Sequence, residues 1–324
     1  MKNIPYIIAE AGVNHNGSLE NAIKLVDKAY ESGADCIKFQ AFSADELVIK
    51  KEPQYEMLSK LELSEEDFEQ MMLCSKNRRL EFLATPFSVK WVEILYELGV
   101  AGFKISSGSI NSLNLLEAVA KTNLPVILST GMSNMVDVSI AVRILRNNGC
   151  GDLSLLHCVS LYPTPIDKAN LFAMHDLKKE FNVSVGFSDH TTDVNIGALA
   201  VAAGASILEK HFTLDKNMEG PDHKASLSPE ELGEYIKFAR LSSIICGEET
   251  KMILLEEKET KKVAQSSLVA KRFIKKGEEI FKDMLAEKRP STGISPMDID
   301  KVIGKITIKD IGIDEALKYE YFLE

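Results

Sequence analysis

Short apolar runs alternate with longer amphipathic segments through most of the chain. The runs are rich in β-branched and aromatic residues and are bounded by polar or glycine-containing segments, which is typical of buried strands. They predict eight strands, at Tyr6–Ala9, Cys36–Phe39, Glu81–Ala84, Gly102–Ile105, Val126–Leu128, Leu153–Leu156, Val183–Phe187 and Ile207–Glu209.

The segments between these runs have the period of a helix, with apolar residues on one face. Residues 64–78, for example, begin at Ser64, a favourable N-cap, and have acidic residues in the first turn and basic residues at the end. Eight strands that alternate with helices predict a (β/α)8 barrel, which typically has about 250 residues. The alternative, a doubly wound sheet, normally has fewer strands, and the G-x-G-x-x-G motif does not follow the first strand here.

The pattern changes after residue 246. Residues 247–265 are strongly charged and predict a helical linker, whereas residues 266–324 contain short β-type pieces separated by dense turn signals. We therefore expect a barrel domain at 1–246, a helical linker at 247–265 and a small β-rich domain at 266–324.

The composition indicates which kinds of binding partner and which cellular location to expect. Hydrophobic residues make up 45% of the chain and charged residues 27%, as in globular proteins with a sizeable core. The net charge of −10 argues against a nucleic-acid partner, but buried lysines can still attract a small anion into a cleft. The five cysteines form no C-x-x-C pair, and no apolar segment is long enough for a signal peptide or a membrane span. We expect a cytoplasmic protein with no membrane partner.

Polar residues stand at the end of every predicted strand. In a barrel of this type the functional groups gather at the carboxyl ends of the strands. Each residue alone has an ordinary structural explanation, but burying unpaired lysines and a glutamate is costly, so the recurrence predicts a site. The residues are Glu10, Lys38, Gln40, Thr85, Lys104, Ser107, Ser129, His157, Ser160, Tyr162, Ser188, Asp189, His190 and His211.

The residue types suggest what this site binds. His190 and His211 end neighbouring strands, and two neutral imidazoles can bind one divalent metal while leaving positions open for water and substrate. With so few protein ligands, Mn²⁺ or Mg²⁺ held partly by substrate oxygens is favoured. Cationic and hydroxyl groups suit a phosphate and a carboxylate, and two carboxylates suit sugar hydroxyls. The first set is Lys38, Lys104, Thr85, Ser107 and Ser129, and the second is Glu10 and Asp222.

Motifs along nearly the whole chain resemble the sialic acid synthase family, in the order the family has them. They are IAEAGVNHNGS (8–18), IKFQ (37–40), ATPF (84–87), FKISSG (103–108), LSTGM (128–132), LHCVSLYPTP (156–165), GFSDHT (186–191), LEKHFT (208–213) and GPDH (220–223). Two C-terminal motifs, SSLVAKRFIKKGE (266–278) and KRPSTGISP (288–296), resemble the small antifreeze-like (SAF) domain attached to these enzymes.

The resemblance implies a metal-dependent condensation of phosphoenolpyruvate with an N-acetylated amino sugar such as N-acetylmannosamine, which gives N-acetylneuraminate and phosphate by C–O cleavage. It implies a domain-swapped homodimer in which Arg289 reaches the partner's barrel and contacts the N-acetyl group. His190 and His211 match the metal ligands. The residues around phosphoenolpyruvate match Lys38, Thr85, Lys104, Ser107, Ser129 and Ser188, and those near the sugar match Glu10, Gln40, Tyr162, Ser160 and Asp222.

Two positions depart from the family pattern. Ser160 lies where many members have Asn, and Ser291 lies where Gly is usual. The TGISP sequence directly after Ser291 resembles the corresponding sequence of family members that act on relatives of sialic acid. N,N'-diacetyllegionaminate synthases, which take a 2,4-diacetamido-2,4,6-trideoxy sugar, are therefore the alternative to the generic expectation of N-acetylneuraminate.

Three other functions would explain fewer of these residues. A Schiff-base aldolase would use Lys104 or Lys210 to form an imine, which leaves the paired histidines without a role. A non-catalytic carbohydrate-binding protein would not need the two lysines and the metal pair. A metal hydrolase would usually have a third protein ligand.

Overall fold

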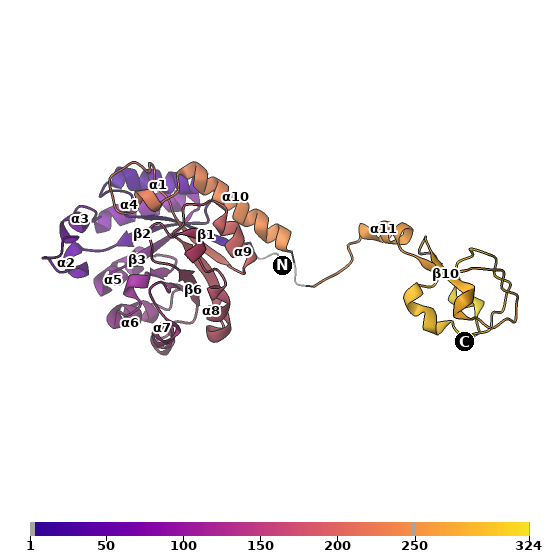
Figure 1. Cartoon of the computed structure of the whole chain (residues 1–324). Coiled ribbons are helices and arrows are strands. Elements are labelled where there is room, and N and C mark those ends of the chain that lie inside the picture. Colours follow the sequence, from indigo (N-terminus) through magenta and orange to yellow (C-terminus); the bar gives the residue numbers. More distant parts are fainter. Residues whose placement is uncertain (1–3, 248–249, 324) are drawn as a thin grey trace. The chain divides into compact units, whose positions relative to one another are not determined.

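The computed structural model describes residues 4–247 and 250–323. The chain forms two compact units, Met1–Gly247 and Glu248–Glu324, which Figure 1 shows in sequence colours. Among the described residues, no helix combines the length and the apolar character needed to cross a bilayer.

The first unit is a closed barrel of eight parallel strands, with helices on its outside (Figure 1). The barrel closes because β1 pairs with β8, from Tyr6 opposite Ile207 to Glu10 opposite His211. This closure confirms the predicted (β/α)8 architecture and excludes the open doubly wound sheet. The strands are β1 (Tyr6–Gly12), β2 (Cys36–Ala41), β3 (Glu81–Pro86), β4 (Phe103–Ile105), β5 (Val126–Ser129), β6 (Leu153–Cys158), β7 (Ser184–Asp189) and β8 (Ile207–His211).

Several helices of this unit begin at polar caps, among them α1, α4, α5, α7 and α10. Ser64, at the start of α4, accepts a hydrogen bond from the Asp67 backbone, and the Asp67 side chain accepts one from the Ser64 backbone. This reciprocal capping satisfies amide groups that the helix itself leaves free. The α-helices are α1 (Leu19–Glu31), α2 (Ala44–Leu47), α3 (Tyr55–Ser59), α4 (Glu65–Arg78), α5 (Val89–Leu98), α6 (Leu113–Lys121), α7 (Met135–Asn147), α8 (Ala173–Phe181), α9 (Ile196–Ala202) and α10 (Pro229–Cys246).

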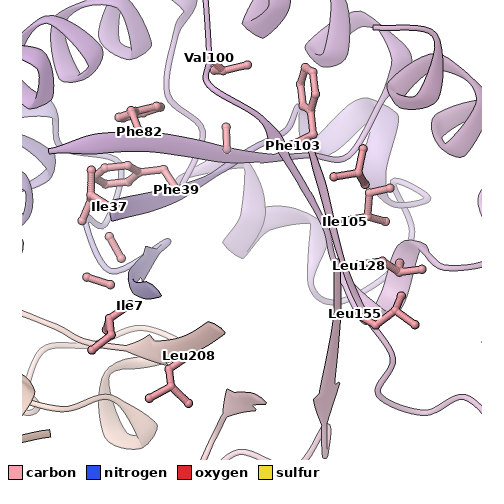
Figure 2. Packing of buried hydrophobic residues seen from close by; sticks show 14 of the residues in the cluster. Ile7, Ile37, Phe39, Phe82, Val100, Phe103, Ile105, Leu128, Leu155 and Leu208 are labelled. Atoms are coloured by element: carbon pink, nitrogen blue, oxygen red, sulfur yellow. The ribbon is translucent and has the colours of Figure 1, made fainter. Parts of the chain in front are cut away.

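Alternation along the strands divides the barrel into two apolar layers. Outward side chains such as Phe39, Phe103 and Leu208 pack under the helices, as Figure 2 shows. Inward side chains near the amino ends of the strands form a separate apolar plug, made of Ile8, Cys36, Leu83, Ile127, Leu156 and Ile207. Above this plug the inward positions are polar, so the fold confines the polar groups to the carboxyl end of the barrel.

Most of the strands extend further than the sequence pattern predicted. β1 continues beyond Ala9 to Gly12, and β8 continues beyond Glu209 to His211. The pattern stops early because hydrophobicity marks only the apolar part of each strand, whereas backbone pairing continues under polar side chains. The polar residues expected just after the strands therefore lie partly within them.

The second unit is built around a small antiparallel sheet, in which β9 (Ser267–Ala270) pairs with β10 (Leu285–Lys288). Its own core includes Leu268, Ile274 and Val302. Within the stretch predicted as a helical linker, α11 spans Glu257–Ala264, and residues 251–254 have no regular secondary structure.

Gly186 gives a test of how tightly the barrel is packed. A Cβ at this position in β7 would lie 2.2 Å from the backbone oxygen of Ile207 in β8. We expect Gly186→Ala to lower the free energy of unfolding by about 3 kcal/mol, because the strands must separate to make room. Denaturant titration followed by the fluorescence of Trp91, the single tryptophan, measures this unfolding.

Gly151→Ala is the matched control, because a Cβ there meets nothing within 4 Å. It should change stability by less than about 0.5 kcal/mol. Equal stability of the two variants would contradict the close approach of β7 and β8.

Candidate functional site

A cavity of about 230 Å³ lies at the carboxyl end of the barrel. Twelve of the predicted site residues line it, and they come from segments spread over all eight strands. These residues are Glu10, Lys38, Gln40, Thr85, Lys104, Ser107, Ser129, Ser160, Tyr162, Ser188, His190 and His211. Asp222 lies beside it, with Oδ2 3.9 Å from Nδ1 of His211. Arg289 is an exposed residue of the second unit.

Four charged side chains form a buried cluster at the base of this cavity. Lys38 Nζ lies 2.9 Å from Glu10 Oε2 and donates a hydrogen bond to Thr85 Oγ1. Lys104 Nζ donates a hydrogen bond to Ser129 Oγ at 2.6 Å. Glu209 Oε2 joins the two lysines, at 3.8 Å from Lys38 Nζ and 3.6 Å from Lys104 Nζ. Glu10, Lys38, Lys104 and Glu209 form what we call the four-charge cluster, and each is at most 4% exposed.

The cluster gives its two carboxyl groups different acidities. Burial raises the pKa of Glu209, but Lys104, Lys38 and the hydrogen bond from Ser188 outweigh it and bring the pKa to about 2. Burial also raises the pKa of Glu10, to about 7, because the nearby negative charge of Glu209 opposes the effect of Lys38. Glu209 is therefore the permanent counter-ion, and Glu10 can take up or release a proton near neutral pH.

The sequence analysis missed Glu209, although the sequence contains a signal for it. In the predicted strand Ile207–Glu209 it is the last residue, and His211 lies beyond the end of that strand. Because side chains on a strand alternate between faces, Glu209 has to face the same way as His211. Extending the strand by two residues would have placed a second carboxylate in the cavity.

The two histidines are neutral and lie next to each other at one side of the cavity. Their ring centroids are 5.5 Å apart, and burial lowers the pKa of each to about 4. His190 Nδ1 lies 2.8 Å from the Val159 carbonyl oxygen, which can only accept, so this nitrogen carries the proton. His190 Nε2 is then the acceptor, and its lone pair points into the cavity beside the hydroxyls of Tyr162 and Ser188, 3.2 and 3.3 Å away.

This pair of imidazoles fits a divalent cation that takes its other ligands from water and substrate. Nδ1 of His211 is buried and has no hydrogen-bond partner, so part of its bonding capacity is unused. Among residues 4–247 and 250–323, no group of three or more His, Cys, Asp or Glu side chains is arranged to hold a metal. The donors therefore do not fit a closed four-ligand zinc site.

A set of hydroxyl and amide donors lies on the other side of the cavity. The Gly131 backbone N–H donates to Ser107 Oγ at 2.9 Å, and Ser107 Oγ lies 3.0 Å from Cys158 Sγ. A Cβ on Gly131 would lie 2.3 Å from Ser160 Oγ, so this close approach requires glycine. Together with Lys38 and Lys104, these donors suit an oxyanion.

Lys210, one of the two lysines considered for a Schiff base, does not line the cavity. It faces away from the barrel interior and forms an ion pair with Asp189 at 3.2 Å. Of the two, Lys104 alone has its amine in the cavity.

Comparisons with known proteins cover nearly the whole chain. The NeuB family model matches residues 25–251, and the SAF domain model matches residues 265–322. The chain is 43% identical to an N,N'-diacetyllegionaminic acid synthase of Campylobacter jejuni, over 96% of this chain and 98% of that protein. It is 39% identical to an N,N'-diacetyllegionaminic acid synthase of Legionella pneumophila, over 98% of this chain and 94% of that protein.

A solved structure supports the same relationship. The N-acetylneuraminic acid synthetase of Leptospira borgpetersenii superimposes with a TM-score of 0.76 at 36% identity, over 80% of this chain and 90% of that chain. The fold and the sequence motifs therefore point to one group of proteins.

The role of Glu209 as a permanent counter-ion can be tested by Glu209→Gln. This change leaves two buried ammonium groups with a single carboxylate, so we expect the free energy of unfolding at pH 7 to fall by about 3 kcal/mol. Added inorganic phosphate should raise the Tm of this variant more than that of the wild type, because the anion replaces the missing charge. Thermal unfolding with chelator present measures both effects.

Glu81→Gln serves as the control, because Glu81 is an exposed residue at the amino end of β3. Its response to phosphate should equal that of the wild type. If Glu209→Gln gained no more from phosphate than Glu81→Gln does, the counter-ion role would be wrong.

Proposed function

This chain belongs to the NeuB family, and on that premise we propose that it condenses phosphoenolpyruvate with the open-chain aldehyde of an N-acetylated amino sugar. The products are a 2-keto sugar acid and phosphate. The observation that carries the proposal is the cavity itself, where two buried ammonium groups, a set of hydroxyl donors and two neutral histidines meet above an apolar plug.

We propose the 2,4-diacetamido-2,4,6-trideoxy sugar as the substrate, in preference to the N-acetylmannosamine favoured by the sequence analysis. The support is the identity of 43% and 39% to proteins named N,N'-diacetyllegionaminic acid synthase, against 36% to an N-acetylneuraminic acid synthetase. Ser160, where many members have the larger Asn, leaves room at the cavity wall for a more substituted sugar. N-acetylmannosamine is the second candidate.

In this proposal, the lysines and hydroxyls hold phosphoenolpyruvate. Lys38 and Lys104 bind its phosphate and carboxylate, together with hydroxyls already hydrogen-bonded to or near these ammonium groups. Those hydroxyls belong to Thr85, Ser107, Ser129 and Ser188. The anchors come from separate strands of a rigid barrel, so the enol carbon is held in one orientation toward the sugar.

Glu10 is the proposed proton donor. A new bond forms between C3 of phosphoenolpyruvate and the aldehyde carbon, and the aldehyde oxygen takes a proton to become a hydroxyl. A carboxyl group with a pKa of about 7 suits this transfer, and Gln40 Nε2, 3.5 Å from Glu10 Oε1, helps to orient it. Bond formation leaves C2 as an oxocarbenium carbon. Water adds to C2 and gives a proton to the Glu10 carboxylate. The resulting C2 hydroxyl becomes the keto group as the C–O bond breaks, and phosphate leaves with the hydroxyl proton.

His190 and His211 would hold a divalent metal, Mn²⁺ or Mg²⁺, as their neutral state and free lone pairs allow. When bound, such an ion supplies Lewis-acid polarisation of the sugar carbonyl. Asp222, beside His211, is placed to orient that imidazole or to accept from a sugar hydroxyl.

A phosphate-release assay with phosphoenolpyruvate and each sugar in turn tests this proposal. We expect kcat/KM to be at least about tenfold higher with the diacetamido sugar, since a pocket that pairs with a polar substituent discriminates against sugars lacking it. A chelator should abolish turnover, and added Mn²⁺ should restore it. The proposal would be overturned if neither sugar supported the release of phosphate, or if borohydride trapped substrate on Lys104.

Arg289→Ala tests the proposed contact of this residue with the N-acetyl group of the sugar in a partner subunit. Loss of one charged hydrogen bond should raise the KM for the sugar about tenfold and leave the KM for phosphoenolpyruvate unchanged. Arg272→Ala is the control, because Arg272 pairs with Glu278 inside the second unit. A change confined to the KM for phosphoenolpyruvate would contradict this role.

A further inference from the structure

We propose that the buried ion pair between Asp189 and Lys210 positions the two histidines of the cavity. This inference rests on the proposed function, because it concerns the divalent metal that His190 and His211 would hold. Asp189 and Lys210 are positioning residues, and they act through the backbone of β7 and β8.

The pair lies directly behind the histidines. β7 and β8 are parallel neighbours, and Asp189 is the register partner of Lys210. Each of these residues immediately precedes a histidine, and alternation turns the pair toward the helices while Ser188 and His211 face the cavity. The ion pair therefore joins the two strands at the position where each presents its imidazole.

The contacts of the pair converge on the residue that follows His190. Asp189 Oδ1 accepts a hydrogen bond from the Thr191 backbone N–H at 2.8 Å. Lys210 Nζ donates to the Thr191 carbonyl oxygen and forms the ion pair with Asp189 Oδ2 at 3.2 Å. On the other side, the His190 carbonyl accepts from the Thr164 backbone N–H at 2.9 Å. The peptide that carries His190 is thus held from both sides.

This arrangement is fully buried. Asp189, Lys210 and Tyr235 of α10 are 0% exposed, and Lys210 Nζ lies 5.6 Å from the centroid of the Tyr235 ring. Gly197 of α9 packs against that ring so closely that a Cβ would come within 2.4 Å of it. Directional bonds in such a buried, closely packed site restrict the arrangement of the strand ends.

Stability alone does not explain the pair. Replacing a buried ion pair with apolar groups of similar volume is often neutral or favourable for folding. Apolar groups would lack the bonds to both backbone groups of Thr191, and so would hold the strands together without fixing the histidine. This difference separates a positioning role from a purely structural one.

The test measures Mn²⁺ binding to the chelator-treated full chain, by electron paramagnetic resonance of free Mn²⁺. Lys210→Met should raise the Kd for Mn²⁺ about tenfold, in the range found when groups that orient metal ligands are removed. It should also lower kcat and leave the KM for phosphoenolpyruvate unchanged, because Lys38 and Lys104 keep their hydrogen bonds to Thr85 in β3 and Ser129 in β5.

The double variant Asp189→Asn/Lys210→Met keeps the side-chain volumes and leaves no unpaired buried charge. We expect its Tm to return toward the wild-type value while the Kd for Mn²⁺ stays raised, because the Thr191 carbonyl has lost its donor. Recovery of both quantities would overturn the positioning role. So would a Lys210→Met protein with lowered Tm and wild-type affinity for Mn²⁺.

Two controls complete the design. Arg240→Met breaks another ion pair, with Asp35 at 2.9 Å. Asp35 directly precedes β2, at the end of the barrel opposite the histidines, so this change should lower the Tm without changing the Kd by more than about twofold. His190→Ala and His211→Ala should abolish Mn²⁺ binding. If they did not, the proposed metal site would fail, which is distinguishable from a failure of the positioning role.

Discussion

The mutual neutralisation of two ammonium groups and two carboxylates in the four-charge cluster is the constraint on which the rest of the structure depends. Any one of these charges, buried alone, would destabilise the fold by several kcal/mol. Together they are tolerable because each ammonium group lies within 4 Å of a carboxyl group, which requires the strands that carry them to keep their register. The cluster therefore fixes the relative positions of β1, β2, β4 and β8, and with them the shape of the cavity.

The barrel resolves this constraint by dividing its interior into layers. The apolar plug at the amino ends of the strands supplies packing, and the polar layer above it supplies chemistry. Both layers are built from inward-facing positions of the same strands. Each strand therefore contributes apolar packing at its amino end and polar groups of the cavity at its carboxyl end. The outward side chains, some of which Figure 2 shows, pack the strands against the helices.

Much of the fold could be predicted from the sequence, because hydrophobic alternation marks the buried part of each strand and Ser64-type caps mark helix starts. The strand ends could not, because a polar side chain such as Glu209 interrupts the apolar pattern while its backbone remains paired. The sequence identifies Lys38, Lys104 and the histidines, because polar residues recur at the strand ends. It does not identify their partners, because a one-dimensional pattern does not say that Glu209 lies between two lysines. Asp189 is a similar case, since its register partner Lys210 lies on another strand.

Register in β7 and β8 has a further consequence, which concerns errors in folding. A slip of one residue in either strand would turn its histidine toward the helices and carry a member of the Asp189–Lys210 pair into the cavity. Charges would then be unpaired on both faces of the sheet at once. Such a slipped pairing is therefore destabilised relative to the native one by several buried, unpaired charges, so the register of these two strands is strongly specified.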